Sequence, residues 1–261
     1  MDYNYRQDSY DTPENTPRMF GDYLSCGTRL FFFYRMILLI IKATFKILKK
    51  GRYTIEDWCD DSYYARRSVE GCGTKIHFRG MSNMDKVSGP VVFIGNHAST
   101  LETFLLPGII CPRKVASFVV KKELIKSSYF GSIMRSTKPV VVNRENPVED
   151  LKTVLNEGTD ILKSGRSMIV FPQSTRTAKF NPEAFNSIGV KLAKKAEVPI
   201  IPIAIKTDFW GNGKVVKDFG KISRDKDVYI EFGEPLHVEG NGKETHAKIV
   251  AFIQTKLKEW E

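Results

Sequence analysis

Twelve residues decide how the fold of this chain is read: Val91-Val92-Phe93-Ile94-Gly95-Asn96-His97-Ala98-Ser99-Thr100-Leu101-Glu102. The apolar run at the start is typical of a buried strand, and the polar residues after it indicate a turn into a helix. A histidine and a carboxylate five positions apart across such a turn suit general-base chemistry. Imidazole titrates near neutral pH, and a carboxylate can hold its other ring nitrogen. His97 and Glu102 are therefore candidate catalytic residues.

Outward from this segment, strands and helices are expected to alternate. The predicted strands are residues 75–78, 91–95, 115–120, 140–142, 167–171, 200–206, 215–222 and 228–232. The predicted helices are residues 100–110, 122–125, 129–134, 147–163, 183–196 and 243–259. This alternation favours an α/β fold: a single layered domain with a mixed, largely parallel sheet flanked by helices.

Candidate site residues follow three of the predicted strands. His97 comes after residues 91–95, Arg144 after residues 140–142, and the run from Gln173 to Arg176 after residues 167–171. Ligand sites of such sheets lie in loops beyond the strand ends. One crevice is therefore expected to collect all three.

The charge balance points to an anionic partner. The chain has 261 residues, with 40 basic and 30 acidic side chains. That length suits one domain plus appendages, and the positive excess suits membrane headgroups, a phosphorylated substrate or nucleic acid. Seven basic residues and no acidic one lie between Arg29 and Arg52, beside an apolar run. This placement favours a membrane surface, and no nucleic-acid partner is expected.

Cysteine and histidine usage argues against a metal centre. The four cysteines form no CxxC unit and there are only four histidines, so no metal site is expected and the thiols are expected to be free. The polar, acidic start of the chain does not resemble a cleavable signal peptide.

Residues 30–50 predict a basic amphipathic helix. Arg35, Lys42, Lys46 and Lys49 fall in one narrow sector at about 100° per residue, and apolar residues fill the rest. We interpret this as an interfacial helix with its apolar face in lipid and its lysines at the headgroups. Two alternatives remain open: a core helix with an exposed lysine stripe, and a true membrane span with snorkelling lysines.

Four motifs in order resemble those of the glycerolipid acyltransferase family, which contains the 1-acylglycerol-3-phosphate acyltransferases. The NHxxxxD motif appears as Asn96, His97 and Glu102, with glutamate in place of aspartate. Gly131 and then residues 141–144 resemble the second motif, a turn ending in arginine. The FPEGTRS motif is matched at Phe171, Pro172, Thr175 and Arg176, and residues 198–203 resemble the proline-bearing fourth motif. The resemblance covers roughly residues 76–235.

The resemblance implies transfer of a fatty acyl group from acyl-CoA or acyl carrier protein to the free hydroxyl of lysophosphatidic acid, giving phosphatidic acid in phospholipid biosynthesis. It implies that His97 is the base and Glu102 its orienting partner. The implied substrate-binding residues are Asn96, Arg144, Gln173, Ser174, Thr175 and Arg176. No permanently bound cofactor is implied, because the acyl thioester is a co-substrate.

The sequence pattern, together with the resemblance, predicts a division of the chain. Residues 1–28 are expected to be a mobile polar tail, residues 29–73 an N-terminal helical element at the membrane interface, and residues 74–261 the acyltransferase domain. The expected location is peripheral, on the cytoplasmic face of a membrane that contains anionic lipid. The expected partners are this membrane, a lysophospholipid acceptor and, as one of the two alternative donors, acyl carrier protein.

Two departures from the family pattern leave the acceptor open. Gln173 stands where a glutamate is usual, which removes a negative charge, and Ser174 stands where a glycine is usual. Another lysolipid, a lipoamino-acid acceptor, or a catalytically altered lipid-binding homologue remain alternatives. Arg144 could also be a surface residue paired with Glu145 or Glu149.

Overall fold

The computed structural model describes residues 7–126, 130–173, 175–214 and 216–261. These residues form one eight-stranded mixed sheet with strand order β1-β2-β8-β7-β3-β6-β4-β5. The strands are β1 (Tyr10–Asp11), β2 (Ile76–Arg79), β3 (Val92–Gly95), β4 (Ala116–Lys121), β5 (Val140–Val142), β6 (Ser167–Val170), β7 (Ile200–Lys206) and β8 (Val228–Phe232). Among them, the β1–β2 and β7–β8 pairs are antiparallel and the others parallel. The predicted α/β class with a largely parallel sheet is confirmed.

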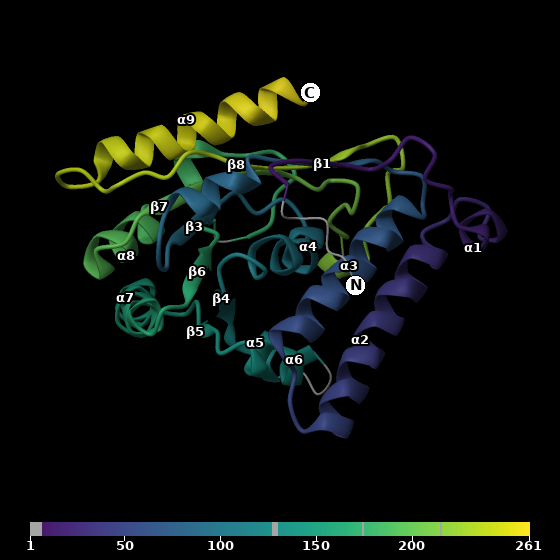
Figure 1. The fold of residues 1–261 in the computed structure, drawn as a ribbon, viewed down its shortest axis with the longest axis horizontal. Helices are drawn as coiled ribbons and strands as arrows, with labels where there is room; N and C mark the ends of the chain where they lie inside the picture. Colours follow the sequence, from purple (N-terminus) through teal and green to yellow (C-terminus); the bar gives the residue numbers. More distant parts are fainter. Residues whose placement is uncertain (1–6, 127–129, 174, 215) are drawn as a thin grey trace.

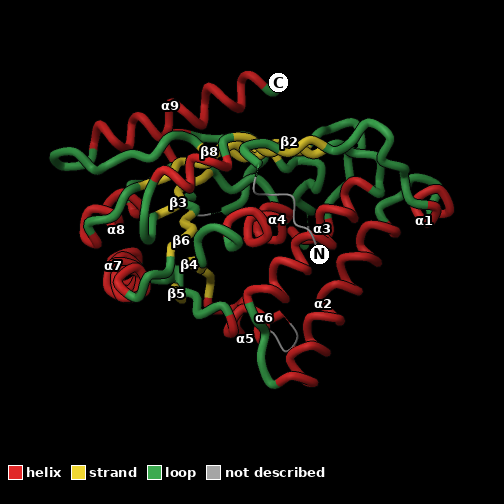
Figure 2. The backbone as a smooth tube through the Cα atoms, in the orientation of Figure 1, coloured by secondary structure: helices red, strands yellow, loops and turns green. Residues whose placement is uncertain are grey.

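Helices cover both faces of this sheet (Figure 1). The α-helices are α1 (Phe20–Leu24), α2 (Leu30–Lys50), α3 (Ile55–Glu70), α4 (Leu101–Ile110), α5 (Lys122–Lys126), α6 (Phe130–Ser136), α7 (Pro147–Lys163), α8 (Ile188–Ala196) and α9 (Lys243–Glu259). Helices α7, α8 and α9 lie on one side, and α2, α3 and α4 lie on the other, as the backbone trace also shows (Figure 2).

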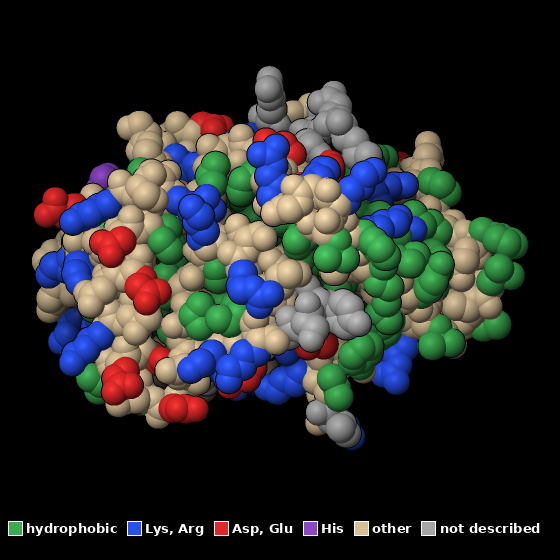
Figure 3. All heavy atoms as spheres, turned by 90° about the horizontal axis from the view of Figure 1, so that it is seen from below, with side chains coloured by type: hydrophobic (Ala, Val, Ile, Leu, Met, Phe, Trp, Pro, Cys, Tyr) green, Lys and Arg blue, Asp and Glu red, His purple; other side chains and the backbone are tan. Residues whose placement is uncertain are grey.

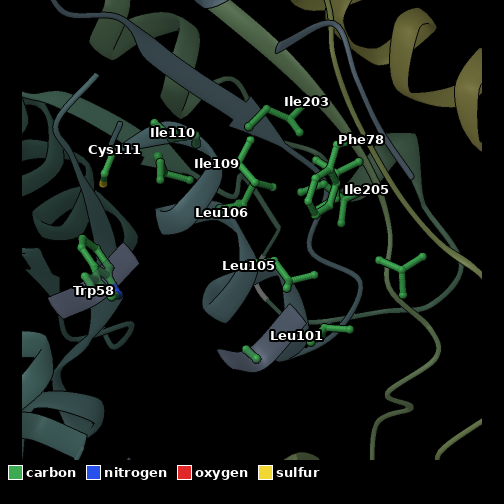
Figure 4. Packing of buried hydrophobic residues seen from close by; sticks show 14 of the residues in the cluster. Trp58, Phe78, Leu101, Leu105, Leu106, Ile109, Ile110, Cys111, Ile203 and Ile205 are labelled. Atoms are coloured by element: carbon green, nitrogen blue, oxygen red, sulfur yellow. The ribbon is translucent and has the colours of Figure 1, made fainter. Parts of the chain in front are cut away.

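The central strand β3 contributes to two separate hydrophobic cores. Phe93 belongs to the core under α2, α3 and α4, whereas Val92 and Ile94 belong to the core under α7, α8 and α9. A strand covered on both faces is apolar at every position rather than at alternate ones, which explains the continuous run in the sequence. Figure 4 shows side chains of α4, among them Leu105 and Ile109, directed toward Ile203 and Ile205 of β7.

Helices α2 and α3 form an antiparallel hairpin with its basic stripe turned inward. Arg35 Nε donates to Ser68 Oγ over 2.8 Å, Lys42 lies over the ring of Tyr64, and Lys46 Nζ lies 2.9 Å from an oxygen of Asp61. The prediction that these cations stand at lipid headgroups is therefore wrong for Arg35 and Lys46, which α3 engages, whereas Lys42 and Lys49 are exposed. Helical periodicity correctly groups them on one face, and α3 packs against part of that face.

Several other boundaries differ from the sequence prediction. Within the predicted mobile tail, β1 pairs with β2, and the buried Asp22 is held by Arg224 at 2.6 Å. The predicted strand at residues 215–222 is wrong over its described part, which contains a 3₁₀ turn at Lys217–Phe219. The helix predicted from residue 183 is interrupted, because a 3₁₀ turn at Pro182–Ala184 precedes α8. Tyr129, in the predicted helix at residues 129–134, lies outside the described residues.

The cysteines and the helix lengths bear on two further expectations. All four cysteines are free thiols, as predicted, and three of them are buried. Over the described residues, no helix has both the length and the apolar character that crossing a bilayer would need.

Candidate active site

His97 and Glu102 face each other at the carboxyl end of β3. The turn after Gly95 returns the chain into α4, and this brings His97 Nδ1 within 2.8 Å of Glu102 Oε1. The His97 ring stacks on Phe171 with centroids 4.4 Å apart and an interplanar angle of 5°. The ring is thus fixed in both position and tilt. With Nδ1 held by the carboxylate, Nε2 is the nitrogen that can exchange a proton with a substrate.

The carboxylate of Glu102 is fully buried and surrounded by donors. Besides His97, its oxygens accept hydrogen bonds from the backbone of Ala98 at 2.7 Å and Ser99 at 2.8 Å, and from Thr207 Oγ1 at 2.5 Å. Burial by itself would raise the pKa of Glu102. The hydrogen bonds and the charge of His97 outweigh it and hold the pKa below its usual value of 4.5. The group is therefore a carboxylate at neutral pH.

Gln173 joins the FPEGTRS-like segment to the histidine turn. Its Oε1 accepts the backbone N–H of His97 over 2.7 Å, and its Nε2 donates to Thr177 Oγ1 over 3.0 Å. The backbone N–H of Thr177 in turn donates to the carbonyl of His97 over 2.9 Å. A neutral amide can accept and donate in this way, whereas a carboxylate could only accept.

Asn96 differs from its predicted role as a substrate-binding residue. Its side chain is buried and makes two hydrogen bonds with the backbone of Ile205 in β7, donating over 2.7 Å and accepting over 2.9 Å. These bonds join β3 to β7 just before the turn. Asn96 therefore holds together the strand ends that carry the site, and its side chain does not line the cavity.

Arg176 lies at the mouth of the site and is paired with an acidic residue. Its Nη1 donates to Thr100 Oγ1 and, over 2.5 Å, to Asp218 Oδ1. Thr100 Oγ1 also donates to Asp218 over 2.7 Å. Burial would raise the pKa of Asp218, but the bonds from Arg176 and Thr100 keep it below its usual value. Next to Asp218, Lys217 donates to Thr175 Oγ1.

These residues line one large cavity of about 1210 Å³. His97, Gln173, Thr175 and Arg176 border it, as do Lys217 and Asp218. Arg144, whose backbone is left-handed with φ 61°, lines the same cavity, and its backbone N–H donates to Asp150 over 2.8 Å. The structure therefore gathers the predicted residues as expected, apart from Asn96; Ser174 lies outside the described residues.

The sequence interpretation missed Thr207, Lys217 and Asp218. Thr207 follows β7, which runs parallel to β3, so the rule that singled out His97 also applies to it. Lys217 and Asp218 carry no comparable signal. They lie in a connection that folds back over the site, and a local pattern does not report such a position.

The chain is similar in sequence and fold to known proteins. A family model described as Acyltransferase matches residues 75–206, which is 132 of the 261 residues. The chain belongs to the acyltransferase family. The matched part runs from the start of β2 through β7 and contains all four motifs. The resemblance stated from the sequence is therefore confirmed.

Within the acyltransferase family, several relatives are similar over most of their length. The chain is 30% identical to the 1-acyl-sn-glycerol-3-phosphate acyltransferase of Pseudomonas aeruginosa, over 80% of this chain and 75% of that one. It is 26% identical to the enzyme of the same name from Bacillus subtilis, over 78% of this chain and 96% of that one. The crystal structure of the 1-acyl-sn-glycerophosphate (LPA) acyltransferase PlsC from Thermotoga maritima shares the fold, with a TM-score of 0.66 at 20% identity, covering 88% of this chain and 93% of that one.

Proposed function

We propose that this acyltransferase esterifies lysophosphatidic acid with a fatty acyl group taken from an acyl thioester, giving phosphatidic acid. The observation that carries the proposal is the position of the His97–Glu102 pair. It borders a cavity that has cationic side chains in one part and an apolar lining in another. The names of the relatives support the acceptor, and they leave the donor open between acyl-CoA and acyl carrier protein.

The chemistry needs a base and no nucleophilic side chain. His97 Nε2 takes the proton from the acceptor hydroxyl while the oxygen attacks the thioester carbonyl. Glu102 stabilises the imidazolium that forms. The tetrahedral intermediate then collapses, the carbon–sulfur bond breaks, and the imidazolium returns its proton to the departing thiolate. A general base of this kind contributes about 10²–10⁴-fold to the rate.

The cationic part of the cavity suits the acceptor phosphate. Arg176, Lys217 and Arg144 all line this cavity, and Lys217 Nζ donates to Thr175 Oγ1. Guanidinium groups bind phosphate oxygens through paired, charge-assisted hydrogen bonds. The pairing of Arg176 with Asp218 supports this assignment, because it shows that the guanidinium is directed to where an anion can be held.

The apolar part of the cavity suits an acyl chain. Its lining includes Phe33, Met36 and Ile40 of α2, Phe118 of β4 and Met134 of α6. The ring of Phe118 packs on that of Phe171, on which the His97 ring stacks, so this apolar lining reaches the catalytic pair. Helix α2 thus takes part in the binding cavity as well as in the surface of the protein.

The outer face of α2 suits the edge of a lipid bilayer. Leu30, Tyr34, Ile37, Ile41, Phe45 and Leu48 are all exposed along it, and Phe20, Tyr23 and Leu24 of α1 are exposed nearby. Figure 3 shows hydrophobic side chains gathered at this end of the molecule. A group of apolar side chains exposed together on one face of a protein typically marks an interaction site. Entry of a lysolipid from the bilayer into the cavity beside α2 would follow from such docking.

Acyl transfer in mixed micelles tests the reaction. Purified protein would be given a labelled acyl group on coenzyme A or on acyl carrier protein, with a panel of lysolipids as acceptors. The expected result is transfer to lysophosphatidic acid, and the better donor identifies the second substrate. Transfer to another lysolipid alone would reject the proposed acceptor, and transfer to none with either donor would reject the reaction.

Vesicle sedimentation tests the docking face. The double variant Ile41→Asp, Phe45→Asp should bind vesicles at least tenfold more weakly than the unaltered chain, because each side chain buries apolar area worth about 1–2 kcal/mol on insertion. Val148→Asp is the matched control, since Val148 is an exposed apolar residue on α7. Equal loss in both variants, or no loss in the double variant, would reject this face.

A further inference from the structure

The connection from β7 to β8 carries a charged pair into the site. We call residues 208–214 and 216–222 of this connection the strap. The strap is held by Trp210 Nε1, which donates to the carbonyl of Asp218 over 3.0 Å, and by Arg29 Nη1, which donates to the carbonyl of Phe219 over 2.7 Å. Asn212 Nδ2 also donates to the carbonyl of Ala98 over 3.0 Å. These anchors do not use the carboxylate of Asp218.

The Asp218 carboxylate lies where an anionic ligand of Arg176 would be expected. It accepts from Arg176 and from Thr100, and its side chain is 52% exposed while that of Arg176 is only 18% exposed. A side chain that is half in water can rotate away while its backbone stays anchored. The carboxylate is therefore displaceable without opening the strap.

We propose that Asp218 is an internal competitor that occupies the phosphate position on Arg176 and Thr100 in the ligand-free enzyme. The head group of the acceptor displaces it, and it returns as the product leaves. This inference rests on the proposed function. It adds to it a residue that sets affinity for the phosphate monoester and promotes release of the acylated product.

A phosphate monoester can bind Arg176 and Thr100 more strongly than the carboxylate of Asp218 does. It has nearly two negative charges at neutral pH and three acceptor oxygens, whereas a carboxylate has one charge and two oxygens. The phosphate can thus hold Arg176 and Thr100 and also accept from Lys217, which is adjacent to Asp218 and lines the same cavity. Because the carboxylate of Asp218 must be displaced first, the net free energy of phosphate binding is smaller. Neither the acceptor nor the product therefore binds too tightly.

Asp218→Asn tests the inference because the amide keeps the shape and an acceptor oxygen for Thr100 but removes the charge. The KM for lysophosphatidic acid should fall about fivefold, which is the upper range for a partly exposed ion pair, and inhibition by phosphatidic acid should strengthen by a similar factor. Asp225→Asn, an equal charge change at an exposed residue beyond the strap, should leave both constants unchanged. An unchanged or raised KM in folded Asp218→Asn would overturn the inference.

Calorimetry with glycerol 3-phosphate provides a readout that does not need turnover. Its affinity should rise about fivefold in Asp218→Asn and be lost in Arg176→Gln. If the unaltered chain transfers no acyl group, the proposed function fails, and this titration still decides the inference. Binding no tighter in Asp218→Asn would overturn it. A fall in the KM for acyl-CoA in place of the KM for the acceptor would also overturn it, by assigning the position to the donor's phosphate.

A second variant covers a folding failure of the first. Asp218→Ser removes the charge and shortens the side chain, and it should give the same direction of change in both measurements. If Asp218 instead positioned Arg176 for substrate, every substitution would weaken binding. Tighter binding after removal of a side chain is therefore the result that separates competition from a structural role.

Discussion

Replacing Glu102 by glutamine should remove most of the activity and leave substrate binding intact. The carboxylate lies 2.8 Å from Nδ1 of His97 and is fully buried, so the imidazolium formed during transfer would lose its counter-charge in a medium with little water. Breaking a buried charged pair costs about 3–5 kcal/mol. Taking the lower part of that range, kcat should fall about 10²- to 10³-fold. The KM should change little, because Glu102 does not line the cavity.

The assay is the initial rate of labelled acyl transfer in mixed micelles, measured beside thermal unfolding of each variant. Glu102→Asp is the matched control, since it keeps the charge and shortens the side chain by one methylene. It should retain clearly more activity than Glu102→Gln. If Glu102→Gln keeps more than a tenth of kcat with an unaltered unfolding temperature, or if both variants lose activity equally, the charge of Glu102 does not stabilise the imidazolium.

Three further predictions concern pH, acyl length and the strap. The pKa of Glu102 is lower in the folded than in the unfolded chain, so its contribution to the free energy of unfolding is fully present above pH 4.5 and is lost as the pH falls through the folded pKa. In denaturant titrations, the difference in the free energy of unfolding between the unaltered chain and Glu102→Gln should therefore shrink only below about pH 4.5. A constant difference down to pH 3 would contradict this. Met36→Trp should fill the apolar part of the cavity, so competition assays should show donor preference shifted by at least two carbons toward shorter acyl chains. An unchanged preference would mean that the acyl chain binds elsewhere. Gly220→Ala should lower the unfolding temperature by several degrees and reduce activity, because a Cβ there would meet the carbonyl of Gly211 across the strap; an unaltered melting curve would show that the strap tolerates the change.

The strand-to-helix turn could be predicted because its signals are local. The apolar run of β3, the polar turn and the acid at the start of α4 lie within twelve residues, and the hydrogen bond between His97 and Glu102 needs no distant element. The rule that sites gather at strand ends also brought Arg144 and Arg176 to the same cavity. Both inferences depend on features that a single sequence expresses directly.

The remaining features depend on tertiary contacts. Periodicity grouped Arg35 and Lys46 on one face of α2, but only the packing of α3 shows that Ser68 and Asp61 cover that face. Residues 215–222 were mistaken for a strand because they include valine, phenylalanine and isoleucine, which favour strands. In the structure, Trp210 and Phe219 of the strap pack instead on Phe32 and Phe33 of α2. Asn96 matched a motif, yet its amide is used by the backbone of β7.

Removal of the proton from the acceptor hydroxyl by His97 can be tested by a single-turnover measurement. Labelled acyl thioester and lysophosphatidic acid would be mixed with excess enzyme, comparing the unaltered chain with His97→Ala. In His97→Ala the rate of ester formation should fall at least 10²-fold, while the affinity for glycerol 3-phosphate is retained. A variant that still forms the ester at more than a tenth of the original rate would contradict the account.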